Sequence, residues 1–539
     1  MSGERLFRIL GLVDDDLIEE AAPGFQAGTA VRRNPWRRVL AAAACVAVLC
    51  CAGFAWQAVF SPRGGSTAAD GGAAPGAENG TGISLGGDPE EAAQDSEPLH
   101  VDSTTFMSYA GPVFPLTTVE TDTALTAERT LTWDFTAGTY QDGSPRQWGA
   151  VITDGYTLSN PTAEDIAVTA LYPFAGSFTE LAELLPTAAV DGAEIEAALY
   201  AGAYAGGFRG TGKNDATTLN LEYPDSWTDY KRLLESGAYL SQALGDAPVL
   251  DIPVTVYEFT DFEAPHEAYR AATQAIEFTI DQERTTVLTY GFNGGSWDWD
   301  TGWRRYDYFV PDGVRRDTDL KLLVVLGEDI GDYTLAGYEN GGCEREIDGV
   351  SCTVTRRETT LDAVLDDLCR YYYNDYAGWQ YGMEDSAVEA VPYPLFRRAA
   401  AELMTQYGVL SGDGVMDRYA DGRLDDMVSE AMCHERVLYL AVPVTVPAGE
   451  SVDITFKLWK EPSFDYGCSG SENVGLQGYD LVTRLGSALD FTAQTAALAN
   501  TDNIEIIRQN LGFDLENGVA EVLLNVEQEH YYLEVRPKK

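Results

Sequence analysis

The sequence has little histidine, little cysteine and few basic side chains, and each shortage excludes a class of protein. Its four histidines form no His-Glu-x-x-His pattern, which excludes the usual ligand set of a zinc protease. Five of the eight cysteines lie beyond residue 60, too few to staple an extracellular scaffold of this length. Lysine and arginine total 36 against 85 acidic residues, and the formal net charge is −49. A chain this acidic repels nucleic acid, so we expect no nucleic-acid partner.

Two motifs of well-known enzyme classes are present only in incomplete form. The stretch GFRGTGKN matches a phosphate-binding loop except at Asn214, where magnesium binding needs serine or threonine. The stretch GCSGS, which begins at Gly467, lacks the closing glycine of a nucleophile elbow. These failures favour a binding, sensing or structural role over catalysis. A surface hydrolase that uses acidic side chains is the alternative.

One long hydrophobic run interrupts the acidic sequence. Residues 39–60 contain no charged side chain, and at about 1.5 Å per helical residue they can cross a bilayer core of about 30 Å. Four arginines lie directly before the run: Arg32, Arg33, Arg37 and Arg38. The positive-inside rule then places residues 1–38 in the cytoplasm and the C-terminal bulk outside the cell. A cleaved signal peptide is the alternative, but its first segment is short and basic, unlike residues 1–38. We therefore expect a single-pass signal-anchor in the cell membrane.

An amphipathic pattern occupies the predicted cytoplasmic segment. Leu6, Leu10 and Leu17 belong to an i, i+3, i+4, i+7 stripe of apolar residues. This stripe predicts one or two short helices that lie near the membrane. The alternative is a docking helix for a cytoplasmic partner, with these three leucines as the candidate contacts.

Residues 1–60 also resemble a group of known sequences. The stretch GLVDDDLIEEA begins at Gly11, and an arginine cluster and an anchor rich in Ala, Val, Leu and Cys follow it. This arrangement resembles the N-termini of uncharacterised single-pass membrane proteins of Gram-positive bacteria, some of which are similar to membrane-bound anti-sigma regulators. The resemblance implies a transmembrane regulator, in which the ectodomain is coupled to a cytoplasmic partner bound by residues 1–38.

Composition and periodicity divide the rest of the chain. Residues 61–99 are rich in Gly, Ala, Ser, Pro and acids, so we expect a disordered stalk. Apolar and polar residues then alternate, as at Leu131 and Trp133, which predicts half-buried strands. A helix is expected over residues 227–244. We expect a mainly β protein (α+β overall), with an extracellular, multidomain, β-sandwich-like region and a helical insertion. The predicted ranges are 100–245 (β-rich), 246–356 (β-rich), 357–436 (helical insertion) and 437–539 (β-rich C-terminal domain).

The stretch NGGSWDWDTGW, which begins at Asn293, is the best candidate for ligand binding. On a strand, the tryptophans at 297 and 299 would share one face, and the aspartates at 298 and 300 the other. Tryptophan rings beside carboxylates can bind sugar rings, and packing of the rings in the core or a loop is the alternative. Carboxylates at i and i+2, about 6–7 Å apart, also fall near the separations used in glycoside hydrolysis. The candidate ligand-binding residues are Trp297, Asp298, Trp299, Asp300 and Trp303, and the candidate ligand is a cell-envelope glycan or protein.

One acidic loop, DGVMDRYADGRLDD, resembles a calcium-binding loop in its spacing. An EF-hand that starts at Asp417 would put Tyr419 and Val428 at positions that need oxygen ligands, so that motif fails. A looser Ca²⁺ site formed by Asp413, Asp417 and Asp421 is one interpretation. An acidic loop that leads into a capped helix is the other, and we expect no other cofactor.

Overall fold

The computed structural model describes residues 110–140, 143–146, 149–204, 227–265, 271–311, 319–376, 391–406, 410, 422–465 and 475–538. Of these residues, 48% lie in strands and 18% in helices, which confirms the expectation of a mainly β region. None of the helices in these ranges is long and apolar enough to cross a membrane. By its contacts the chain divides into Met1–Ser96 and Glu97–Lys539, and every described residue belongs to the second unit.

Several features predicted from the sequence lie outside the described residues, and they stay predictions. They are the membrane anchor at residues 39–60, the stalk at residues 61–99, the leucine stripe of Leu6, Leu10 and Leu17, and the calcium candidates Asp413, Asp417 and Asp421.

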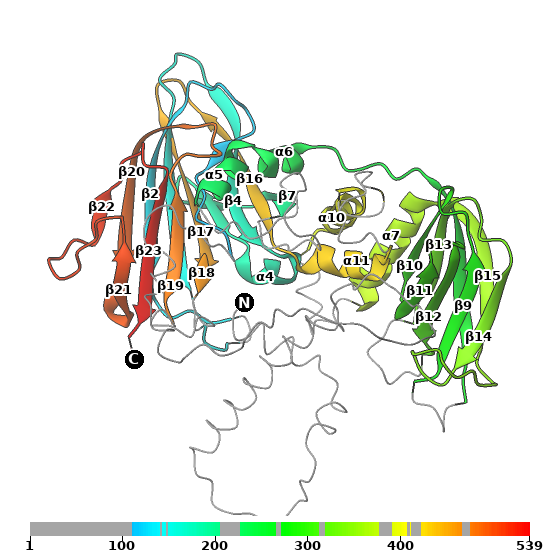
Figure 1. The fold of residues 1–539 in the computed structure, drawn as a ribbon. Coiled ribbons are helices and arrows are strands. Elements are labelled where there is room, and N and C mark those ends of the chain that lie inside the picture. The colour runs from blue at the N-terminus through cyan, green and yellow to red at the C-terminus, as the bar shows by residue number, and fades with distance from the viewer. Residues whose placement is uncertain are drawn as a thin grey trace, which may run out of the picture. The chain divides into compact units, whose positions relative to one another are not determined.

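The largest sheet of the described region contains seven strands. In spatial order they are β22 (Glu521–Leu523), β20 (Asp490–Ala499), β2 (Thr126–Asp134), β3 (Ala150–Ser159), β17 (Ser451–Lys460), β5 (Thr187–Val190) and β6 (Ala193–Ile195). β2 and β20 are parallel, and the other neighbouring pairs are antiparallel. Strands from distant parts of the sequence therefore lie side by side (Figure 1). Alternate residues such as Leu131 and Trp133 are buried, as the period of a strand requires.

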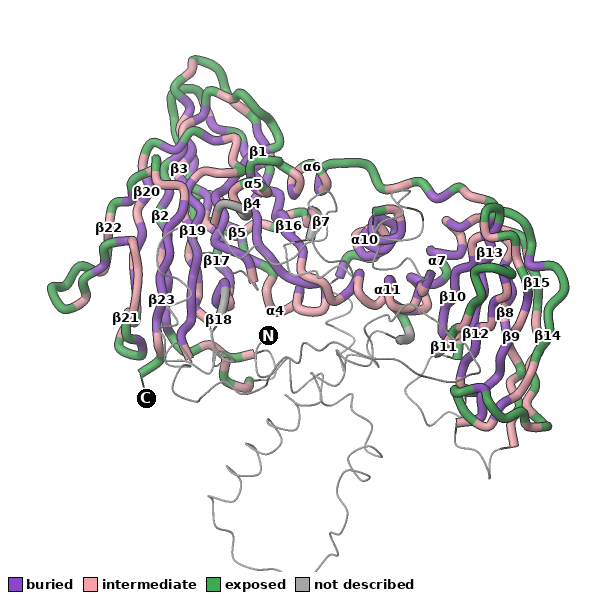
Figure 2. The backbone as a smooth tube through the Cα atoms, viewed as in Figure 1, coloured by how far each residue is buried: buried purple, intermediate pink, exposed green. Residues whose placement is uncertain are grey.

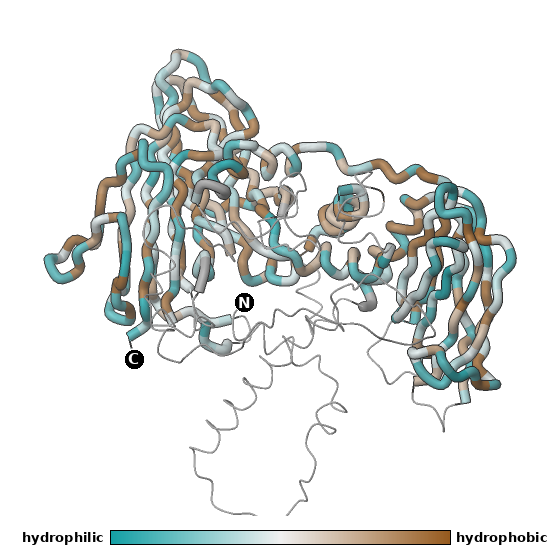
Figure 3. The backbone as a smooth tube through the Cα atoms, viewed as in Figure 1, coloured by the Kyte–Doolittle hydropathy of each residue, from teal (hydrophilic) through white to brown (hydrophobic). Residues whose placement is uncertain are grey.

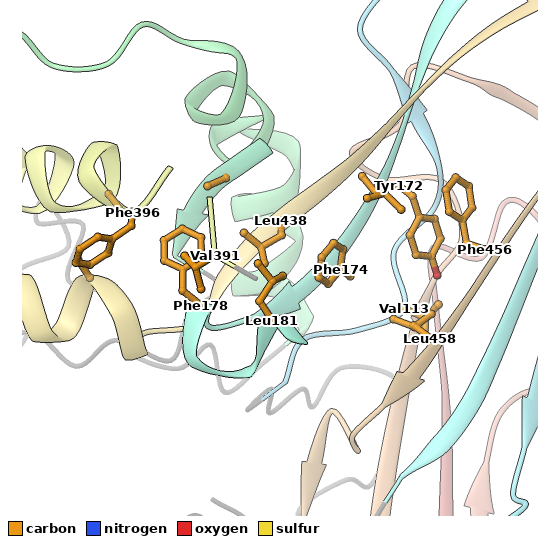
Figure 4. Close-up of a cluster of buried hydrophobic side chains, with 14 of the residues drawn as sticks. Val113, Tyr172, Phe174, Phe178, Leu181, Val391, Phe396, Leu438, Phe456 and Leu458 are labelled. Atoms are coloured by element: carbon orange, nitrogen blue, oxygen red, sulfur yellow. The ribbon is translucent and has the colours of Figure 1, made fainter. Parts of the chain in front are cut away.

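Two four-stranded sheets accompany the largest one. The first contains β1 (Thr117–Thr118), β4 (Ile166–Gly176), β16 (Arg436–Val446) and β7 (Ala198–Tyr204), and the second contains β18 (Phe464–Asp465), β19 (Gln477–Val482), β23 (His530–Pro537) and β21 (Ile504–Gln509). The ring of Tyr172 in β4 stacks on Phe456 in β17, with centroids 4.2 Å apart (Figure 4). This contact joins the first of these sheets to the seven-stranded sheet, and it is compatible with the predicted sandwich.

Residues 253–360 form two further four-stranded sheets, both antiparallel. One contains β10 (Thr285–Tyr290), β13 (Lys321–Gly327), β8 (Pro253–Glu263) and β15 (Ser351–Thr360), and the other contains β11 (Gly294–Asp298), β12 (Trp303–Phe309), β9 (Thr273–Thr279) and β14 (Tyr333–Tyr338). The rings of Phe259 in β8 and Tyr308 in β12 meet edge to face, with centroids 5.7 Å apart. Buried residues predominate in β9, β10 and β13, whereas β11, β14 and β15 are largely exposed or half-buried (Figure 2).

Helices follow or separate these groups of strands. They are α4 (Leu181–Leu184), α5 (Trp227–Glu235), α6 (Ala238–Leu244), α7 (Leu361–Tyr371), α10 (Tyr393–Gln406) and α11 (Leu424–Cys433), with short 3-10 turns at Phe178–Glu180 and Thr501–Asn503 and a π turn at Tyr372–Tyr376. The single helix expected over residues 227–244 is divided at Gly237, whose φ of +65° ends a helix. The hydroxyl of Thr360 caps α7 by accepting the N–H of Ala363 at 3.3 Å. Hydrophobic and hydrophilic residues are interspersed along the strands and helices that Figure 3 draws in colour.

Two ion pairs are buried within this arrangement. Arg129 of β2 pairs with Asp154 of β3, and Glu402 of α10 pairs with Arg436 of β16. All four side chains are at most 3% exposed. Because a buried charge that loses its partner is costly, loss of either partner of these pairs should destabilise the packing.

Candidate functional site

The hairpin of β11 and β12 carries the tryptophans that the sequence singles out. The two strands are antiparallel, and Trp297 lies opposite Arg304. β11 ends at Asp298, so Trp299 lies in the turn and the strand alternation expected from the sequence stops before it. The N–H of Gly302 donates a hydrogen bond of 3.0 Å to the carbonyl oxygen of Asp298, which closes the turn.

Two local features fix the shape of this turn. Gly302 has a φ of +75°, and a Cβ there would come within 2.1 Å of the carbonyl oxygen of Ile280, so the position requires glycine. One carboxylate oxygen of Asp298 accepts the N–H of Asp300 at 2.9 Å and the N–H of Thr301 at 3.3 Å. The Asp298 carboxylate therefore stabilises the turn that presents Trp299.

Trp297 and Trp299 form an exposed pair. They are 48% and 68% exposed, with ring centroids 6.4 Å apart and ring planes at 72° to each other. Two indole rings in this arrangement offer apolar surface to a ligand from two directions. Trp303 is only half-exposed and lies opposite Asp298, on the other face of the hairpin from Trp297. The structure therefore brings two of the three predicted tryptophans together.

Two residues that the sequence does not single out hold Trp299 in place. Arg304 is buried, and its guanidinium carbon lies 4.8 Å from the centroid of a Trp299 ring. Arg304 donates a hydrogen bond of 2.8 Å to the side-chain oxygen of Gln282, and the Gln282 amide donates one of 2.6 Å to the carbonyl oxygen of Trp299. The position of Arg304 beside Trp303 in the sequence is a signal that could have identified it. Gln282 lies in the β9–β10 turn, 17 residues from Trp299 in the sequence, so no local pattern indicates that the two residues are in contact.

A second candidate, the acid–base pair of Asp480 and His530, is buried. Nε2 of His530 lies 2.7 Å from a carboxylate oxygen of Asp480, and the two side chains are 2% and 0% exposed. The ring of Trp227 in α5 stacks on His530 with centroids 4.5 Å apart, and Lys231 of α5 bonds to Glu529 at 2.6 Å. This cluster holds α5 against β23 and does not present the pair to a substrate.

Neither a metal site in the described residues nor a similar known protein indicates a function. Within the described ranges, no three His, Cys, Asp or Glu side chains are arranged to hold a metal ion. Neither a protein family nor a curated protein matches the sequence. The exposed tryptophan pair is the feature of the described region most suited to binding a ligand.

Proposed function

We propose that this chain is a membrane-anchored cell-surface protein whose ectodomain binds a cell-envelope glycan at the β11–β12 hairpin. The observation that carries the proposal is the exposure of Trp297 and Trp299 on a turn that hydrogen bonds hold in shape. Single exposed apolar residues are normal on protein surfaces. Two neighbouring residues of the largest aromatic type, by contrast, are typical of an interaction surface.

The geometry of the pair suits a saccharide. The apolar face of a sugar ring can lie against an indole, and burial of one large aromatic side chain stabilises a complex by about 1.5–3 kcal/mol. Because the ring planes differ by 72°, the pair can contact two successive sugar units or two sides of one. The exposed carboxylate of Asp300 beside them can accept hydrogen bonds from sugar hydroxyls.

The N-terminal part of the proposal rests on the sequence. Residues 39–60 would anchor the chain with its N-terminus in the cytoplasm, because the uncharged run follows four arginines. Residues 61–99 would form a stalk, because their composition cannot bury a core. The hairpin would then be displayed outside the cell, away from the membrane surface.

Replacement of both exposed tryptophans is expected to remove glycan binding. Trp297→Ala with Trp299→Ala should weaken binding to the recognised polysaccharide at least about tenfold, since loss of about 1.4 kcal/mol is sufficient for that factor. The full-length protein in a non-ionic detergent would be tested by pull-down with insoluble cell-envelope polysaccharides. Tyr200→Ala, which removes an exposed aromatic ring from β7, is the matched control and should leave binding unchanged.

Two outcomes would contradict the proposed function. One is that the wild-type protein binds none of the cell-envelope polysaccharides. The other is that the double variant, with an unchanged melting temperature, binds as well as the wild type. Both side chains are largely exposed, so the free energy of unfolding should fall by only about 1 kcal/mol or less per site, including the contact of Trp299 with Arg304.

A further inference from the structure

Four exposed carboxylates lie around the tryptophan pair. They are Asp281, Glu283, Asp298 and Asp300. The last two flank Trp299 directly in the chain. The first two belong to the β9–β10 turn, which meets the hairpin because Gln282 between them donates a hydrogen bond of 2.6 Å to the Trp299 carbonyl oxygen. The surface beside the rings therefore carries several negative charges.

The arginines of this region offset only part of the negative charge on the tryptophan side. Arg304 is 7% exposed and supplies one positive charge against Trp299. Arg284 forms an ion pair with Glu328, at 2.6 Å between nitrogen and oxygen. Arg305 lies on the face of the hairpin that carries Asp298 and Trp303, where it donates a hydrogen bond of 3.2 Å to the hydroxyl of Ser296, so its charge offsets that of Asp298 most directly. A ligand that approaches the exposed rings consequently meets carboxylates first.

Tryptophan rings also attract cations directly. The face of an indole is electron-rich, and a cation within about 6 Å of the ring centroid is stabilised by it. The chain already uses this attraction, because the guanidinium of Arg304 lies 4.8 Å from a Trp299 ring centroid. Trp299 is nevertheless 68% exposed, so most of its surface remains open to a ligand.

We infer that the ligand of this hairpin is a polymer of amino sugars with free, protonated amino groups. The inference rests on the proposed function and specifies that the glycan is positively charged. The four carboxylates attract the ammonium groups, and the indole faces bind both the ammonium groups and the sugar rings. An N-acetylated sugar lacks the positive charge, and a polymer of uronic acids is repelled.

The test compares three soluble saccharides of equal length on the full-length protein in a non-ionic detergent. They are a glucosamine hexamer, its fully N-acetylated form and a galacturonate hexamer. The glucosamine hexamer should bind at least about tenfold more tightly than its N-acetylated form, and the galacturonate hexamer should not bind. Because salt screens exposed charges beyond about 10 Å at 0.1 M, the affinity for the glucosamine hexamer should fall several-fold as salt is raised.

A paired charge removal identifies the carboxylates responsible. Asp300→Asn with Glu283→Gln removes two charges and leaves both rings and the turn-forming Asp298 in place. This variant should bind the glucosamine hexamer several-fold more weakly and with a smaller dependence on salt. The control is Asp490→Asn with Glu521→Gln, which removes two exposed carboxylates from the seven-stranded sheet and should leave the affinity unchanged.

The possible results separate this inference from the proposed function. Equal affinity for the glucosamine hexamer and its N-acetylated form, lost in Trp297→Ala with Trp299→Ala, would overturn the inference and leave the proposed function standing. Unchanged affinity in Asp300→Asn with Glu283→Gln would also overturn it. Failure of the protein to bind any saccharide would overturn both.

Discussion

Substitution of Glu402 by alanine is expected to lower the free energy of unfolding by about 3–5 kcal/mol, because it breaks a buried ion pair from one side. Glu402 lies in α10 and is 2% exposed. Its carboxylate accepts a hydrogen bond from Arg436, and bonds of 2.8 Å each from Gln242 and from Nε of Arg398. Without the carboxylate, the guanidinium of Arg436 loses its counter-charge in a site that water does not reach.

The same substitution should loosen the helices from the sheet. Arg436 belongs to β16 and also donates a hydrogen bond of 2.9 Å to the carbonyl oxygen of Gly202 in β7, while Gln242 belongs to α6. Faster hydrogen exchange in α6 and α10 should therefore accompany the loss of stability that urea unfolding measures. Glu358→Ala is the control, because this glutamate pairs with Arg356 at the surface and its loss should cost at most about 1 kcal/mol. A cost below about 1 kcal/mol for Glu402→Ala would show that the network does not hold the helices.

Substitution of Asp154 by alanine is also expected to lower the free energy of unfolding by about 3–5 kcal/mol. Asp154 is fully buried and accepts hydrogen bonds from Arg129 at 2.9 and 2.7 Å, from Tyr156 at 2.8 Å and from Tyr172 at 3.4 Å. Burial raises the pKa of both tyrosines well above the usual value, so their phenols stay protonated donors. Burial alone would lower the pKa of Arg129, but the charge and hydrogen bond of Asp154, together with the neighbouring Tyr156 and Tyr172, outweigh burial and raise the pKa.

A double-mutant cycle distinguishes the broken ion pair from lost packing. Arg129→Met and Asp154→Leu each leave one buried charge without its partner, whereas the double variant removes both charges. The loss of unfolding free energy in the double variant should therefore be smaller than the sum of the losses in the two single variants, by at least about 1 kcal/mol in urea unfolding. Strictly additive costs would contradict the structural role given to the pair.

Local pattern identifies the buried face of α7. Leu361, Leu365 and Leu368 recur with helical spacing, and all three are buried in α7. The sequence did not predict the break between α5 and α6, because the apolar periodicity continues across Gly237. The break is caused by the positive φ of this one glycine. Periodicity thus indicates which residues are buried more reliably than where an element ends.

Pairing between distant strands could not be predicted from local pattern. Alternation at Leu131 and Trp133 shows that β2 has a buried face, but it does not show that β20 will lie parallel to it. The partners of Arg129 follow from the same tertiary arrangement. A lone buried arginine in a strand pattern gives no sign of which carboxylate will meet it.

Part of the candidate site could be predicted from the sequence, and part depends on the tertiary structure. Trp297, Trp299 and the aspartates between and beside them are recognisable in the sequence as one short stretch. Gln282 and the carboxylates of the β9–β10 turn join the site only because β9, β11 and β12 belong to one sheet. The negative charge of the site, which selects the ligand in our proposal, is therefore partly a product of the fold.

Oxidative footprinting of the tryptophans tests the central claim most directly. The full-length protein would be exposed to hydroxyl radicals with and without saturating glucosamine hexamer, and oxidation at each tryptophan would be measured by mass spectrometry. In the free protein, Trp297 and Trp299 should oxidise far faster than the fully buried Trp133. The account predicts that the saccharide protects these two residues and leaves Trp133 unchanged. Unchanged oxidation of both Trp297 and Trp299, or protection confined to other tryptophans, would contradict it.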